Sequence, residues 1–136
     1  SGFGLIANYT FVDSDLAYDN LSLGPQFAIE GLADSANLVA FYDKNGWIVR
    51  AAYNWRDDFL TARFDGNGLP NPMYTESYGQ IDALISYTFP NSGWTVFAEG
   101  FNLTDEYLRL YGRAEKQTMF VTTTGRRYGI GARWTF

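Results

Sequence analysis

The chain contains no cysteine and no histidine among its 136 residues. Without cysteine it forms no disulfide and uses no thiolate, and without histidine it cannot assemble a Ser-His-Asp or Cys-His arrangement within itself. Long apolar runs are also missing, since none approaches the roughly 18 residues that a membrane-spanning helix needs. We therefore expect a protein that is not an enzyme, with no catalytic residues, no metal site and no cofactor.

Basic residues are few, ten against fifteen acidic ones, which gives a net charge of −5. They do not cluster among aromatic residues, so nucleic acid is not expected as a partner. The chain is instead rich in aromatic side chains, which make up 18% of it, and contains fourteen glycines. This mixture favours strands and turns over helices.

Six segments alternate between apolar and polar side chains with the period of two that indicates a strand. We expect strands at about 2–12, 36–43, 47–57, 77–89, 94–104 and 118–136. In the last of them Tyr128, Ile130, Ala132 and Trp134 take every second position. Each strand should then present one apolar face and one mostly polar face.

The connections between these segments alternate in length. Two are tight turns, "DKNG" at 43–46 and "PNSG" at 90–93, because Asn, Gly and Pro favour chain reversal. The other three, at about 13–35, 57–77 and 104–118, are long and polar. Short turns on one side and long loops on the other are typical of outer-membrane β-barrels. The predicted fold is all-β, an antiparallel transmembrane β-barrel segment of about six strands.

At the alternate strand positions that carry apolar side chains, tyrosine and tryptophan lie toward the strand ends, whereas alanine and branched aliphatic residues lie at the strand centres. Amphipathic rings prefer the headgroup level of a bilayer and aliphatic side chains prefer its hydrocarbon. The expected lipid-interface residues are Trp47, Tyr53, Trp55, Tyr87, Trp94, Tyr128 and Trp134.

Six strands are too few for a closed barrel, because single-chain outer-membrane barrels begin at about eight. An open sheet edge in hydrocarbon leaves backbone groups unpaired, at a cost of several kcal/mol each. We expect the chain to be part of a larger barrel, with the remainder before Ser1 and the C-terminus in the periplasm.

Four segments, "NLVAFYDKNGWIVRAAYNWRDDFL", "YTESYGQIDALISYTF", "WTVFAEGFNLTDEYLRLYGR" and "TGRRYGIGARWTF", resemble in this order the last strands of TonB-dependent outer-membrane receptors. The stretch "GFNLTDEY" at 100–107 is similar to that family's Gly-x-Asn-Leu-Thr-Asp/Asn signature. The resemblance implies a twenty-two-stranded barrel around an N-terminal plug. It also implies active uptake of a scarce nutrient, of the siderophore-iron, cobalamin or saccharide type, across the bacterial outer membrane.

The same resemblance implies the partners. These are outer-membrane lipid, the protein's own plug and remaining barrel strands, the TonB complex through an N-terminal part that this sequence lacks, and the barrel assembly machinery. Gly131, Trp134 and Phe136 look like the signal that this machinery reads.

The candidate site residues lie at the mostly polar alternate positions of the strands and in the long loops. The lumen-facing candidates are Arg50, Asn54, Arg56, Gln80, Glu99, Arg127 and Arg133. Their charges either pair with one another across strands or face the plug and the substrate path. The candidates for ligand contact in extracellular loops are Tyr74, Tyr78, Tyr107 and Tyr111, because binding residues concentrate on loops.

Two alternatives remain open. One is a small self-contained outer-membrane barrel with a binding or adhesion role, with further strands inside 13–35 or 107–118. The other is a soluble β-sandwich binding module, because alternation by itself does not say whether the apolar face meets lipid or a second sheet.

Overall fold

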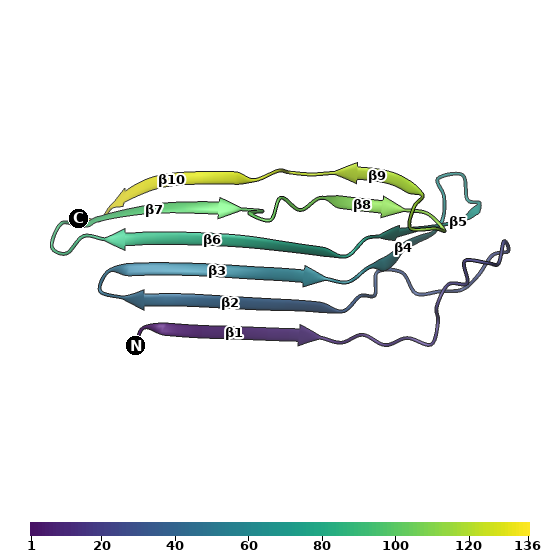
Figure 1. Ribbon diagram of the computed structural model, residues 1–136, viewed down its shortest axis with the longest axis horizontal. Helices are drawn as coiled ribbons and strands as arrows, with labels where there is room; N and C mark the ends of the chain where they lie inside the picture. Colours follow the sequence, from purple (N-terminus) through teal and green to yellow (C-terminus); the bar gives the residue numbers. More distant parts are fainter.

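The alternating segments form one antiparallel sheet of six strands, which we call the large sheet, in a computed structural model that describes residues 1–136. Its strands are β1 (Phe3–Thr10), β2 (Ser35–Lys44), β3 (Trp47–Arg56), β6 (Tyr78–Thr88), β7 (Trp94–Phe101) and β10 (Arg127–Trp134). They lie side by side in chain order, and both chain ends lie at the end of the sheet that carries the short turns (Figure 1). The chain is therefore all-β, with antiparallel pairing throughout.

Two of the three long connections contain strands. β4 (Phe59–Phe64) and β5 (Pro70–Thr75) lie in the second and β8 (Leu108–Tyr111) lies in the third. With β9 (Thr118–Thr122), at the start of the expected last strand, they pair into a second antiparallel sheet, the small sheet. Figure 1 shows the small sheet beyond the end of the large sheet opposite the short turns. Local pattern did not reveal β4, β5 and β8, because they are short and their ladders contain register shifts.

The structure also differs from the expected single strand over 118–136. The chain forms β9, leaves the ladder at residues 123–126, and then forms β10. The side chain of Thr123 accepts a hydrogen bond from the N–H of Gly125, which has a φ of 63°. This local turn shifts the chain between sheets, because β9 pairs with β8 whereas β10 pairs with β7.

The two short turns form as the sequence predicts. Between β2 and β3 only Asn45 and Gly46 lie outside the strands, with φ of 55° and 82°. Two successive positive φ values define the Asn-Gly hairpin turn whose twist matches that of the flanking strands. The β6–β7 turn likewise has positive φ at Asn91 and Gly93.

The register brings the apolar positions of all six strands onto one face, which we call the apolar face. Residues directly opposite in an antiparallel pair share a face of the sheet. The matched apolar pairs include Leu5–Ala40, Ala40–Ala51, Ala51–Ala83, Val49–Ile85, Ile85–Ala98 and Ala98–Ile130. The alternation seen in each separate segment thus becomes one continuous apolar surface, and the opposite polar face carries the candidate charged residues.

Two phenylalanines on the polar face interrupt its polar character for a structural reason. Phe41 lies opposite Gly4, and Phe97 lies opposite Gly131. In each pair a Cβ on the glycine would overlap the phenylalanine ring. The rings therefore lie over the neighbouring glycine backbone, an arrangement that supports strand pairing at glycine positions.

Very little of this chain is buried. Only 9 of 136 residues are buried, and the accessible surface is 9224 Å². A compact soluble monomer of the same mass exposes about 7,200 Å². The excess is apolar in large part, since Leu5, Tyr128 and Ile130 are 67%, 71% and 89% exposed.

No second layer covers the large sheet. The substantial packing between strands is confined to hydrogen-bonded neighbours within each sheet. The outer strands β1 and β10 each have one edge without a partner strand. None of the elements is a helix with the length and apolar character needed to span a membrane.

Candidate functional site

The polar face of the large sheet carries the charged residues singled out from the sequence. Arg50 and Glu99 lie in one row across β3, β6 and β7, separated by Leu84. They line a pocket of about 320 Å³ together with Asn37, Ala52, Asn54, Asp82, Ala83, Leu84 and Phe101. Arg133, near the short-turn end, lines a separate pocket with Leu84, Ser86, Thr95 and Phe97.

These polar-face charges do not pair with one another. The chain's three ion pairs, Glu30–Arg63, Glu76–Arg109 and Asp105–Arg126, lie elsewhere. Arg56 instead lies 4.4 Å from the ring centroid of Phe59, and Arg127 lies 5.6 Å from that of Phe101. The guanidinium groups thus remain available to carboxylates or other acceptors from outside the chain.

A row of hydrogen bonds follows β6 along the polar face. The hydroxyl of Tyr78 donates to Gln80 Oε1 at 2.6 Å, and Gln80 Nε2 donates to Asp82 Oδ1 at 2.6 Å. The backbone N–H of Asn102 donates to the same Asp82 oxygen at 2.9 Å. This row connects the polar face to the end of β7, where the "GFNLTDEY" stretch begins.

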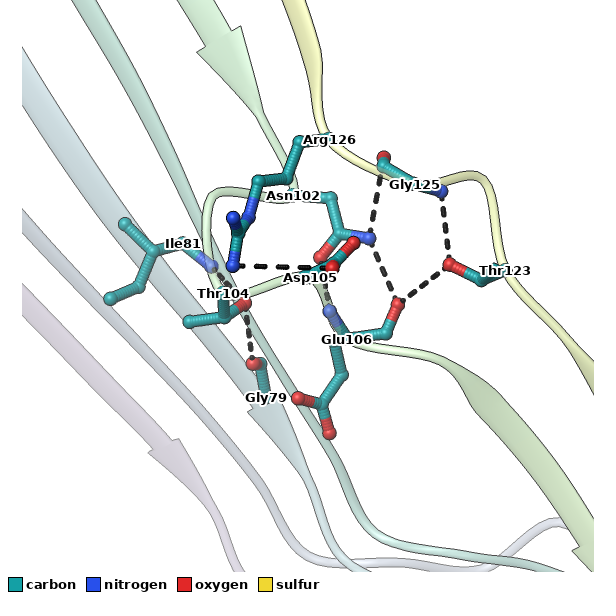
Figure 2. Close-up of polar contacts among 9 residues, drawn as sticks. All are labelled: Gly79, Ile81, Asn102, Thr104, Asp105, Glu106, Thr123, Gly125 and Arg126. Carbon is teal, nitrogen blue, oxygen red and sulfur yellow. Dashed lines mark hydrogen bonds and ion pairs between the residues drawn. The ribbon is translucent and has the colours of Figure 1, made fainter.

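That stretch forms a tight turn centred on Asn102, whose side chain is the most buried polar group of the chain at 1% exposure. Its Nδ2 donates to the carbonyl of Glu106 at 2.9 Å, and its Oδ1 accepts from the N–H of Glu106 at 2.8 Å. Nδ2 also lies 3.5 Å from the carbonyl of Gly125 (Figure 2). Asn suits this position because φ is 52°, in the left-handed region that Asn tolerates.

The turn is also tied to β6 and to the chain that enters β10. Thr104 donates its hydroxyl to the carbonyl of Gly79 at 3.2 Å, and the N–H of Leu103 donates to the carbonyl of Ile81 at 2.8 Å. Asp105 lies 4.0 Å from Arg126 in an exposed ion pair (Figure 2). One short motif therefore holds three strands of the large sheet at the end that faces the small sheet.

A larger pocket, of about 440 Å³, lies beside this turn where the two sheets meet. It is lined by Asn54, Trp55 and Arg56 of β3, Tyr78 of β6, Glu106, Leu108 of β8, Thr122 of β9, and Thr123 and Thr124 of the β9–β10 connection. We call it the junction pocket. It contains the predicted residues Asn54, Arg56 and Tyr78, and sequence reasoning missed Glu106 and the three threonines, because only the folded chain brings them to β3.

The four tyrosines expected in extracellular loops do not form one group. Tyr74 and Tyr111 are register partners in the small sheet, with stacked rings 5.3 Å apart. Their hydroxyls donate to Asn20 Oδ1 and Asp58 Oδ2. Tyr78 lines the junction pocket, and Tyr107, 48% exposed, precedes β8.

Burial raises the pKa of both Tyr74 and Tyr111 above the ordinary tyrosine value. For Tyr111 the hydrogen bond to Asp58 and the charge of that carboxylate raise the pKa further. These two rings therefore act as packing residues of the small sheet with occupied hydroxyl groups. Arg113, which sequence reasoning also missed, ties the small sheet to the first long connection by donating to the carbonyls of Asn20, Ser22 and Pro70.

All seven aromatic residues expected at the lipid interface lie on the apolar face of the large sheet. At the short-turn end they contact one another, with ring centroids 4.7 Å apart for Trp47 and Tyr87 and 6.3 Å apart for Trp94 and Trp134. At the other end lie Tyr53, Trp55 and Tyr128. Two aromatic zones thus flank a central zone of alanine and aliphatic side chains.

The three residues that look like an assembly signal lie on or after β10. Gly131 faces the ring of Phe97, and the indole N–H of Trp134 donates to the carbonyl of Ser92 at 3.2 Å. Phe136 is fully exposed and its ring lies 5.2 Å from that of Trp134. Strand β10 is in this way attached to the β6–β7 turn.

Fold and site together describe an open antiparallel sheet with one apolar and one polar face. No protein family, no curated protein and no solved structure matches this chain.

Proposed function

We propose that the large sheet is a segment of the wall of a transmembrane β-barrel, and that this barrel belongs to a TonB-dependent outer-membrane receptor for active uptake of a scarce nutrient. The observation that carries the proposal is the register, which places the apolar positions of six successive strands on one uncovered face. A face of this kind is stable only against lipid or against another apolar surface. The chain provides no such surface of its own.

Strand length and aromatic position support lipid as the covering medium. The strands have from 8 to 11 residues, close to the roughly 9–11 that cross a bilayer when tilted. Aromatic residues lie at both ends of the apolar face, as they do at the two interfaces of outer-membrane barrels. The short turns then lie at the periplasmic end, and the small sheet lies on the extracellular side.

The unpaired edges of β1 and β10 indicate that further strands complete the wall. A backbone edge in hydrocarbon costs several kcal/mol for each unpaired group, so membrane barrels are closed. In the receptor we propose, the remaining barrel strands pair with these edges and the polar face surrounds a plug. Arg50, Glu99 and Arg127, which have no ion-pair partner within the chain, are then free to meet plug or substrate.

The alternatives fit these observations less well. A soluble β-sandwich needs a second sheet packed on the apolar face, and the small sheet instead continues beyond one end of the large sheet (Figure 1). A small self-contained barrel would need its edge strands to pair with each other, whereas β1 and β10 are at opposite edges of an open sheet.

Neighbouring positions on opposite faces test the membrane assignment. Ile85→Arg places a charge on the apolar face, whereas Ser86→Arg places it on the polar face of the same strand. An arginine at the lipid-facing midplane of a barrel costs about 2–4 kcal/mol. We expect the complete protein to be recovered from the outer-membrane fraction, with much less of the Ile85→Arg variant and near-normal amounts of Ser86→Arg. Recovery of the unmodified protein in the soluble fraction would contradict the proposal.

Transport is tested separately from membrane insertion. Cells that depend on the complete protein are grown on a limiting ferric siderophore, cobalamin or oligosaccharide, with and without a functional TonB complex. Growth that requires both the protein and TonB supports receptor function. Growth that requires the protein but is independent of TonB supports a passive barrel and overturns the receptor assignment.

A further inference from the structure

The junction pocket has the size and the wall chemistry of a binding site. Its volume of about 440 Å³ falls within the roughly 300–1,000 Å³ typical of small-molecule sites. Its wall combines two charged groups of opposite sign, Arg56 and Glu106, with amide and hydroxyl groups and the aromatic residue Tyr78. Because two sheets contribute to it, the pocket is positioned by backbone pairing and by the Asn102 turn.

The two charged side chains of this wall have no ion-pair partner within the chain. Arg56 and Glu106 form no ion pair with each other or with any other residue. Figure 2 shows the Glu106 carboxylate pointing away from the hydrogen bonds of the Asn102 turn, which use only its backbone. The side chain of Asn54 accepts a hydrogen bond from Asn37 through Oδ1, which leaves its Nδ2 donors free.

The charges of the pocket wall indicate which class of ligand it can bind. One guanidinium and one carboxylate give the wall no net charge, so neither an anion nor a cation would be attracted without also being repelled. A ligand hydroxyl both donates and accepts, and so can satisfy the carboxylate of Glu106 and the donors of Arg56 and Asn54. We infer that the junction pocket binds a neutral, polyhydroxylated ligand of the oligosaccharide class. This inference deepens the proposed function, because it narrows the nutrient to the saccharide type, and in that respect it rests on the uptake proposal.

The remaining wall residues suit the same ligand. The ring of Tyr78 offers apolar surface to the C–H face of a sugar ring. Thr122 and Thr124 add hydroxyls that both donate and accept, whereas the hydroxyl of Thr123 already bonds the Glu106 carbonyl and the Gly125 N–H. An anionic iron complex would instead be expected to select a wall with an excess of arginine or lysine, which this pocket lacks.

Tryptophan fluorescence of the complete protein in detergent micelles gives a direct binding test. The probes are maltotriose, cellotriose and xylotriose as neutral ligands and ferric citrate as an anionic one. We expect a saturable change with at least one trisaccharide and none with ferric citrate. Affinity should fall about tenfold or more in both Glu106→Gln and Arg56→Gln, because each removes a charged hydrogen-bond partner.

Lys44→Gln is the control, since it removes an exposed positive charge at the short-turn end, outside the junction pocket. It should bind the trisaccharide as the unmodified protein does. No response to any of the three trisaccharides, a response unaffected by both pocket substitutions, or preferential binding of ferric citrate would overturn the inference. Membrane fractionation is an independent readout, so a protein that binds a trisaccharide but is not in the membrane would refute only the proposed function.

Discussion

Asn102 and Glu106 exchange two hydrogen bonds: Nδ2 of Asn102 donates to the carbonyl of Glu106, and the N–H of Glu106 donates to Oδ1 of Asn102. This exchange closes the turn after β7 and places the Glu106 side chain at the junction pocket. The conformation of a single asparagine therefore links the architecture of the large sheet to the site.

Replacing Asn102 should destabilise the protein strongly. Asn102→Ala leaves the N–H of Glu106 without a partner and its carbonyl with Thr123 alone, at a site that is 1% exposed, and we expect a loss of about 2–3 kcal/mol in the free energy of unfolding. Chemical unfolding followed by tryptophan fluorescence measures it. The control is Asn91→Ala, which also removes an asparagine at positive φ but at an exposed turn. Equal losses for the two variants would contradict a role for the buried hydrogen bonds.

Gly46 should be sensitive for two reasons that can be separated. Its φ is 82°, and a Cβ would lie 2.6 Å from the carbonyl oxygen of Thr88. Gly68 has a similar φ of 78° with nothing within 4 Å of its Cβ position. Gly68→Ala should therefore cost only the backbone strain, about 1–2 kcal/mol, and Gly46→Ala should cost clearly more in the same unfolding measurement. If both variants lose the same stability, the close approach to Thr88 has no energetic effect.

Gly131 and Phe97 should be energetically coupled. Gly131→Ala introduces a Cβ where the Phe97 ring now lies, so it should lower the stability of the β7–β10 pair. Adding Phe97→Ala should recover part of that loss, with a coupling of about 0.5–3 kcal/mol in a double-mutant cycle. Gly129→Ala is a milder comparison, because the atoms that it meets belong to the flexible side chain of Glu99. Simple additivity of the Gly131 and Phe97 substitutions would refute the proposed contact.

Alkaline pH should destabilise the small sheet through Tyr111. Burial, and then the hydrogen bond to Asp58, raise the pKa of Tyr111 above the value of about 10 in an unfolded chain. Because the folded state holds this proton more tightly, the stabilisation is complete below about pH 10 and decreases as the pH rises through the folded-state pKa. In Tyr111→Phe this part of the pH dependence should disappear from unfolding curves measured between pH 8 and about 12. An unchanged pH dependence would show that Tyr111 does not contribute.

The large sheet was predictable because its signals are local. Alternation along each strand and the Asn45-Gly46 turn depend on residues adjacent in sequence, and the register confirmed that the apolar positions share one face. The small sheet was not predictable in this way. Its strand β8 has only four residues, too few for a clear alternation, and one of its two partners, β5, is distant in the chain.

The candidate site also contains some features that were predictable from the sequence and some that were not. Arg50, Arg56 and Glu99 could be placed on the polar parity from sequence, because side chains alternate strictly along a strand. Their lack of ion-pair partners could not, since it depends on which residues the neighbouring strands bring opposite them. Glu106 gave no sequence signal of its own beyond its place in the "GFNLTDEY" stretch.

By itself, the sequence determined the all-β character, the two hairpin turns and the division of each strand into an apolar and a polar face, because steric preferences and period-two alternation act over a few residues. Only the tertiary structure decided that β4, β5, β8 and β9 form a second sheet, that Asn102 closes a buried turn, and that Arg56 and Glu106 line one pocket. The β5–β8 pairing, the burial of Asn102 and the junction pocket depend on contacts between segments distant in the chain, which no local stretch contains.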